Sequence, residues 1–272
     1  MTQPDTANDS AEQPLMTHLI ELRNRLLKIV LAVLLVFLSL FYFANDLYLI
    51  LVEPLSSILP VEGGMIATGV ASPFLVPFKL TIVLAIFLSV PFILHQVWSF
   101  IAPGLYQHEK KFAIPLLLSS IVLFYTGIVF AYYVVLPLAF SFFTSVGPQG
   151  VTLMPDIDNI LNFILKMFFA FGIAFEIPIA TFLMVLMGAT TVESLTAKRP
   201  YIFLGCFVVG MFVTPPDVIS QTILAVPMWM LFEVGVLFAR LIKRPKDDND
   251  EIDDTDPTSN SIDLNSIDSN RQ

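Results

Sequence analysis

The chain has 272 residues, of which 56% are hydrophobic and only 14% are charged, and its mean hydropathy is +0.79. This balance is too apolar for a soluble domain of that length, so the composition excludes the soluble classes and predicts a membrane protein. The formal net charge of −9 is local, because residues 247–272 hold nine acidic residues and one arginine. We expect no nucleic-acid partner.

Six apolar stretches are candidate spans, since a helix needs roughly 20 apolar residues to cross a hydrocarbon core of about 30 Å. They lie at about 26–44, 74–98, 112–137, 159–187, 200–214 and 219–239. The predicted fold class is therefore an all-α membrane protein with six transmembrane helices. The fifth stretch is short and the sixth only just adequate, so either the bilayer beside them is locally thin or these helices tilt little.

Polar segments flank the spans at both ends of the chain. Residues 1–14 and the acidic tail 246–272 contain no aromatic residue. Such segments cannot bury enough apolar surface to fold, so both are expected to be disordered. A functional role for the tail remains an alternative. The domain organisation predicted is one six-helix membrane domain at 15–245.

The basic residues of this domain fall in alternate connections, which predicts its orientation. The connections at about 45–73, 138–158 and 215–218 contain no Lys or Arg. The cations are Arg23, Arg25 and Lys28, then Lys110 and Lys111, then Lys198 and Arg199, and finally Arg240, Lys243, Arg244 and Lys246. The positive-inside rule then places both termini in the cytoplasm. No cleavable signal peptide is recognised, because the N-terminus is polar and acidic.

Prolines within or at the ends of the spans predict bends, because each removes a backbone donor. They are Pro77, Pro91, Pro115, Pro137, Pro178 and Pro227. Kinked helices favour a curved bundle with a concave face. Pro215 and Pro216 predict a tight hairpin before the last span, and Asp217 is placed to cap that helix.

Enzyme and metal chemistry have no support in the sequence. The single cysteine, Cys206, allows no internal disulfide, and His18, His95 and His108 show no metal-ligand spacing. Phosphate-binding loops and protease motifs are absent from the sequence. We therefore predict a protein that is not an enzyme and has no catalytic residue, cofactor or metal.

Two carboxylates stand among cations on the predicted cytoplasmic face. Glu21 precedes the first span beside Arg23 and Arg25, and Glu109 lies in the loop before the third span. One interpretation is ordinary pairing, of Glu21 with Arg25 one helical turn away and of Glu109 with Lys110. The other is that both carboxylates receive cations from a partner, and the spacing leaves both open.

Glu176 lies near the middle of the fourth predicted span, where a charge is costly. It either fills the backbone gap left by Pro178 or forms a polar spot on the concave face. Lys79 and Lys166 lie toward the outer side of their spans, from which their side chains are expected to snorkel to water.

Four segments resemble the TatC family, the multi-spanning core of the twin-arginine protein translocase. They are His18–Leu26, Phe100–Lys111, Ala170–Pro178 and Gly210–Asp217. The resemblance covers roughly residues 15–245 and leaves out the acidic tail. It implies a receptor in the bacterial inner membrane that binds twin-arginine signal peptides of folded cargo. It also implies a multimeric complex in lipid with the single-span partners TatA and TatB, driven by the proton-motive force.

The resemblance also assigns roles to residues. It places signal-peptide binding at Glu21, Arg23, Phe100 and Glu109, an intramembrane polar site at Glu176, outer-loop or structural roles at Pro54, Ser72 and Asp217, and partner-helix docking at Met211, Thr214 and Gln221. A guanidinium donates two parallel hydrogen bonds to one carboxylate, so paired arginines would want two carboxylates.

Two other classes compete with this interpretation. A secondary transporter would explain Glu176 as a proton or ion site, but the sequence carries no internal repeat to support it. A purely structural membrane scaffold is the third possibility.

Overall fold

The computed structural model describes residues 9–58, 65–101, 113–146, 154–214 and 217–241, and the statements below refer to these residues. By its contacts the chain divides into Met1–Arg240 and Leu241–Gln272, and the described structure belongs almost wholly to the first unit. Helices make up nearly all of it, and an isolated bridge between Ile66 and Asp156 is the β-type pairing found there.

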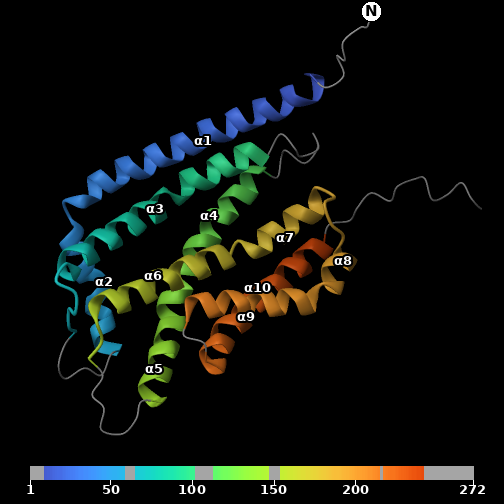
Figure 1. The fold of residues 1–272 in the computed structure, drawn as a ribbon. Helices are drawn as coiled ribbons and strands as arrows, with labels where there is room; N and C mark the ends of the chain where they lie inside the picture. The colour runs from blue at the N-terminus through green and yellow to red at the C-terminus, as the bar shows by residue number, and fades with distance from the viewer. Residues whose placement is uncertain (1–8, 59–64, 102–112, 147–153, 215–216, 242–272) are drawn as a thin grey trace, which may run out of the picture. The chain divides into compact units, whose positions relative to one another are not determined.

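The helices follow one another along the chain as Figure 1 labels them. They are α1 (Asp9–Phe41), α2 (Ala44–Ile58), α3 (Ser72–Ile101), α4 (Ala113–Phe130), the π-helical turn η3 (Ala131–Val135), α5 (Leu136–Val146), α6 (Ile157–Ala174), α7 (Ile177–Leu186), α8 (Val192–Ala197), α9 (Arg199–Val213) and α10 (Val218–Arg240).

Five stretches of helix in the described chain are long and apolar enough to cross a membrane. They are Leu19–Phe41, Ser72–Ile101, Ile114–Val146, Ile157–Leu186 and Val218–Arg240. The remaining predicted span corresponds to α9, which has only 15 residues and is about 22 Å long at 1.5 Å per residue. All six predicted positions are helical, but α9 by itself is shorter than a usual hydrocarbon core.

The predicted long loop at 45–73 is wrong over its first part, which forms α2. This helix packs along α3 through Leu47 and Leu51. At 15 residues it is shorter than the roughly 20 apolar residues by which a span is recognised in a sequence. Pro54 falls within α2, and its side chain lies outside the described part of the structure.

The third span is longer than predicted, because helix continues through Pro137 to Val146. The turn before the proline widens to a π-helix, in which the Leu136 N–H bonds to the Ala131 carbonyl, five residues back. A single wide turn is a common way to fit a residue that lacks a donor into a helix. The proline therefore changes the winding here and does not end the span.

The fourth span does break where a proline predicted a bend. α6 ends at Ala174 and α7 begins at Ile177, with Pro178 in its first turn. The intervening N–H groups remain paired, Phe175 to the Phe171 carbonyl at 2.9 Å and Glu176 to the Ile173 carbonyl at 3.0 Å. The break therefore leaves a polar side chain at a bend inside the span.

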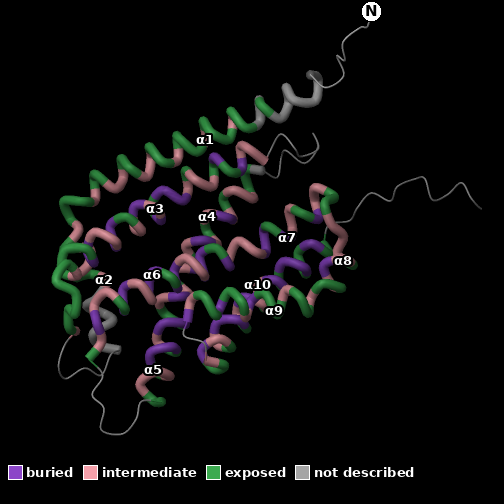
Figure 2. Tube along the Cα trace, in the orientation of Figure 1, coloured by how far each residue is buried: buried purple, intermediate pink, exposed green. Residues whose placement is uncertain are grey.

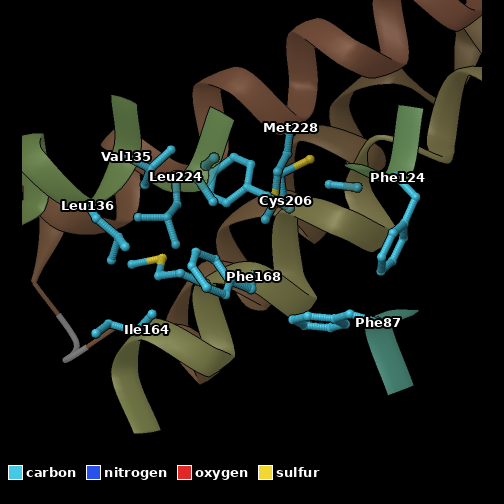
Figure 3. Close-up of a cluster of buried hydrophobic side chains, with 14 of the residues drawn as sticks. Phe87, Phe124, Val135, Leu136, Ile164, Phe168, Cys206, Leu224 and Met228 are labelled. Atoms are coloured by element: carbon cyan, nitrogen blue, oxygen red, sulfur yellow. The ribbon is translucent and has the colours of Figure 1, made fainter. Parts of the chain in front are cut away.

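The best-buried side chains lie on α6 and on the helices around it. Figure 2 shows buried positions running along α6 and α10, whereas α1 is largely exposed and lies beside α3. Figure 3 shows the main cluster of buried side chains, which come from α3, α4, η3, α5, α6, α9 and α10. They include Phe87, Phe124, Val135, Leu136, Ile164, Phe168, Cys206, Leu224 and Met228. α6 is therefore the element around which the neighbouring spans pack.

Two glycines allow these helices to approach closely. A Cβ at Gly127 on α4 would lie 2.5 Å from the Phe171 carbonyl oxygen of α6. A Cβ at Gly235 on α10 would meet the Thr181 hydroxyl and lie 2.8 Å from Pro178 Cα. Small residues serve this purpose in membranes, where lipid removes the hydrophobic advantage of burying larger side chains.

We expect Gly235→Ala to lower the free energy of unfolding by about 1–3 kcal/mol, because the added methyl group has backbone in its way. The measurement is the thermal unfolding midpoint of the protein in detergent. Gly205→Ala is the matched control, since a Cβ there meets nothing within 4 Å. Equal midpoints for the two variants would contradict the close approach of α10 and α7.

Candidate functional site

Glu21 and Arg25 form an ion pair on one face of α1. The Arg25 guanidinium donates to Glu21 Oε1 from Nη2 at 2.5 Å and from Nε at 3.0 Å. The spacing of four residues had predicted this pair as one of two interpretations, and the structure contains it. Pairing accounts for Arg25, but it does not by itself exclude a second cation at Glu21.

Arg25 also bonds to α3, which fixes where the pair stands. Its Nη1 lies 3.4 Å from the Gln96 carbonyl and 3.5 Å from the Gln96 side-chain oxygen, and its Nη2 donates to the Ser99 carbonyl at 3.2 Å. These acceptors lie in the last turns of α3, just before Phe100. One guanidinium therefore ties the polar end of α1 to the end of α3 and orients the Glu21 carboxylate.

The Glu21 carboxylate keeps one oxygen available. Both bonds from Arg25 go to Oε1, and within the described residues no hydrogen bond to Oε2 is recorded. The Glu21 side chain is 41% exposed. The geometry can therefore accept a further N–H donor from outside the chain without breaking the pair.

The other residues predicted to bind the signal peptide differ in where they lie relative to the Glu21–Arg25 pair. Arg23 is exposed, and its guanidinium lies 3.3 Å from the Asn24 side-chain oxygen, not near Glu21. Phe100 is half-buried close to the Arg25 anchor. Glu109 lies outside the described residues, so its predicted place beside Glu21 stays a prediction.

Glu176 occupies the break between α6 and α7. It is the residue before α7, yet its side chain makes no capping hydrogen bond there, so the structure does not support the interpretation that it fills the gap beside Pro178. Its Oε1 is buried with no partner. The Ser120 hydroxyl of α4 lies close enough to interact with the carboxylate.

A tryptophan from a third element completes this polar cluster. Trp98 Nε1 on α3 lies 3.4 Å from the Ser120 hydroxyl oxygen, and both residues are buried. α3, α4 and the α6–α7 break therefore converge on one carboxylate. An unpartnered buried oxygen at this depth can accept a proton or a donor from another molecule.

At the opposite end of α3, Asp156 clamps the segment before that helix to α6. Its Oδ1 caps α6 by accepting the N–H groups of Asp158 at 2.9 Å and Asn159 at 3.2 Å, and its Oδ2 accepts both the hydroxyl and the N–H of Thr68. The Thr68 bonds, with the two backbone caps, hold the pKa of Asp156 at about 2. Two backbone bonds beside Ile66 add to the clamp.

The sequence reasoning missed this clamp. An aspartate directly before an apolar helix is a cap signal, which could have predicted its bonds to α6 but not the bond to Thr68. Lys79, expected to snorkel to water, instead pairs with Asp158 at 2.6 Å. Ser72, the first residue of α3, is half-buried and donates its N–H to the Gly69 carbonyl at 3.1 Å.

The predicted docking residues at the α9–α10 hairpin differ in exposure. Met211 is exposed and Gln221 is half-buried, but Thr214 is 5% exposed and its hydroxyl donates to the Gly210 carbonyl at 3.0 Å. The Thr214 hydroxyl is therefore satisfied within the chain and needs no partner. Asp217 caps α10 as predicted, accepting the Ser220 N–H at 2.7 Å.

A second ion pair missed in the sequence ties α9 to α10. Arg199 Nη2 donates to Glu233 Oε2 at 2.6 Å. The remaining Arg199 Nε and Glu233 Oε1 are buried with no partner in the described structure. The pair fixes the start of the short α9 against the longer α10.

Comparisons with known proteins agree on one family. The family model for the Sec-independent protein translocase protein (TatC) matches residues 17–227. The Sec-independent protein translocase protein TatC of Azotobacter chroococcum mcd 1 is 59% identical over 241 residues, 89% of this chain and 93% of that protein. The TatC protein of Haemophilus influenzae is 54% identical over 250 residues, 92% and 97% of the two chains. A crystal structure of the twin arginine translocase receptor TatC matches at 38% identity with a TM-score of 0.75, covering 82% of this chain and 98% of that one.

These likenesses, with the multi-spanning helical fold, define the class as a membrane component of a bacterial protein translocase. The chain belongs to the TatC family. The family consists of translocase components, not of enzymes, and a multi-span protein of this kind is consistent with the inner membrane.

We expect the clamp at Asp156 to make stability depend on acid. Its folded pKa of about 2 lies below the ordinary value of 3.8 for an aspartate, so its contribution to stability is present above pH 4 and is lost as the pH falls toward 2. The measurement is the thermal unfolding midpoint at pH 7 and pH 3 for the wild type and Asp156→Asn. The variant should have the lower midpoint at pH 7 and lose less on acidification, and equal losses would contradict the clamp.

Proposed function

We propose that this protein is the core receptor subunit of a twin-arginine translocation system. It binds the twin-arginine signal peptides of folded proteins at its cytoplasmic face and exports them with TatA and TatB, using the proton-motive force. One observation carries the proposal, namely the Glu21 carboxylate that Arg25 holds by one oxygen only.

The chemistry of that carboxylate suits an arginine guest. A guanidinium forms short charge-assisted bonds with a carboxylate oxygen, and a half-exposed site accepts it without full desolvation of the peptide. The anchor of Arg25 on the Gln96 and Ser99 carbonyls keeps Glu21 in place before the guest arrives. Glu109 is proposed as the second carboxylate for the second arginine.

The orientation belongs to the same proposal. With both termini in the cytoplasm, the Glu21 end of α1 and the end of α3 face the compartment in which folded cargo is made. The Asp156 clamp then lies at the outer surface. Arg23 and Phe100 border the site from the exposed and half-buried sides respectively.

Glu176 and the α9–α10 hairpin are proposed as the places where the single-span partners act. The cluster of Glu176, Ser120 and Trp98 offers an acceptor inside the span to a polar group of a moving helix. Met211 and Gln221 lie on the hairpin with side chains at least partly exposed. Interhelical hydrogen bonds in membranes average about 0.6 kcal/mol, which suits partners that assemble and leave.

A secondary transporter remains a second candidate, because the unpartnered Glu176 oxygen is what an ion or proton site would show. Family membership favours the receptor. Uptake of a labelled solute by the chain alone in liposomes would support the transporter instead.

The test of the receptor is binding of a twin-arginine peptide. We expect Glu21→Ala to weaken binding, because a hydrogen bond to a charged group contributes about 1.5–3 kcal/mol, which corresponds to roughly 10- to 150-fold in Kd. Glu109→Ala should behave similarly, and Glu109→Lys should lose more because repulsion is added. The measurement is fluorescence anisotropy of a labelled peptide with purified protein at physiological salt.

Glu193→Ala is the matched control, since Glu193 is an exposed carboxylate on α8. A twin-lysine peptide should bind the wild type more weakly, because Lys lacks the planar fork of N–H donors that a guanidinium presents to its acceptors. If both alanine variants bind the arginine peptide as tightly as the wild type, the two-carboxylate site is wrong.

Variants of Glu176 separate charge from polarity inside the span. We expect Glu176→Gln to insert and fold normally, because an amide stays polar and can form hydrogen bonds without carrying a charge. Glu176→Leu should reach the membrane in normal amounts but export poorly, because the acceptor is gone. The measurement is the amount of a twin-arginine reporter in the periplasm, normalised to the membrane level of the variant. Normal export by the leucine variant would contradict a role for this cluster.

A further inference from the structure

A groove of about 450 Å³ lies between α6 and α9 and opens to the surroundings of the helices. Asn162 and Lys166 on α6 line one end of it. Further along the two helices the lining is apolar, from Phe169, Ala170, Ile173 and Val209. Because residues follow one another along each helix, the two polar side chains of the groove lie toward its Asn162 end, among Leu165, Phe212 and Val213, and the deeper lining is wholly apolar.

Lys166 brings an uncompensated positive charge to this groove. Its side chain is exposed, and the described residues record no hydrogen bond or ion pair for it. The acid two turns earlier on the same helix, Asp158, is already paired with Lys79 at 2.6 Å and accepts the Asn162 amide at 3.1 Å. A cation inside an apolar segment needs a counter-charge or water.

The short α9 brings the polar surface of the bilayer toward this lysine. Lys166 lies nine residues beyond the start of α6, about 13 Å along its axis. α9 is about 8 Å shorter than a usual hydrocarbon core, and its last residue, Val213, borders the same groove. Lipid beside a short helix thins to match it, so headgroups there descend toward the level of Lys166.

We propose that the groove between α6 and α9 binds one phospholipid of the leaflet that surrounds the Asp156 end of α6. The headgroup phosphate pairs with Lys166 and lies beside Asn162, and an acyl chain runs along Phe169, Ile173 and Val209. The polar-to-apolar order along the groove follows that of a lipid from head to tail. The positive charge makes anionic phospholipids the preferred class.

The experiment places a benzophenone amino acid at Phe212, an exposed residue that lines the groove. The full-length protein is reconstituted with phosphatidylcholine and one-fifth phosphatidylglycerol, then irradiated, and intact mass spectrometry identifies what is attached. We expect the ratio of phosphatidylglycerol to phosphatidylcholine adducts to exceed their ratio in the bilayer about five-fold, the effect of about one lysine near a charged surface. Lys166→Gln should abolish the enrichment, and Lys166→Arg should retain it.

Lys28→Gln is the matched control, because Lys28 is an exposed cation on α1 outside the groove; it should keep the enrichment. Three results would overturn the proposal. They are an adduct in proportion to bilayer composition, an enrichment that survives Lys166→Gln, and a crosslink to a protein helix in place of lipid. The Arg variant shows whether a loss in the Gln variant comes from charge and not from misfolding.

Discussion

Inside a bilayer the backbone has no water to bond with, so each N–H and C=O group of a span must find its partner within the protein. The structure meets this requirement in different ways at Pro137 and at Pro178. Before Pro137 the helix widens to a π-helical turn, and before Pro178 it breaks and restarts. The second solution places Glu176 at the break between α6 and α7, where its half-buried carboxylate lies close to Ser120. The position of the intramembrane acid is thus a consequence of backbone bonding.

Ion pairs near the ends of the spans determine which charged groups stay unpaired within the protein and can bind other molecules. Arg25, Lys79 and Arg199 each join two helical positions and use up most of the acceptors near them. Among the groups without a partner in the described residues are one oxygen of Glu21 at one end of the bundle and the ammonium group of Lys166 near the other. An exposed pair contributes little to stability, so the main effect of these pairs is to orient groups and to leave specific ones free. The proposed peptide site and the proposed lipid site both follow from this selection.

The length and position of the apolar runs were enough to predict a helical membrane protein and where its helices lie. These features are local, because a run of apolar residues becomes a helix in lipid whatever its neighbours are. The bend at Pro178 and the cap at Asp217 were likewise predicted correctly, since each depends on residues within one turn. The four motifs that resemble TatC predicted the family, which the comparisons confirm.

Only the tertiary structure decided which residues meet across helices. Arg25 reaches acceptors 71 and 74 residues away, and Asp156 bonds to a threonine 88 residues before it. No spacing rule connects such positions, because the packing of α1 and α6 on their neighbours brings them together. The short α2 and the local bond of the Thr214 hydroxyl to the Gly210 carbonyl were missed for other reasons, since α2 is too short to be recognised as a span and a threonine hydroxyl can bond either to its own helix or to a partner. The sequence by itself determined the helices and their chemistry, and packing determined which polar groups are satisfied and which remain available.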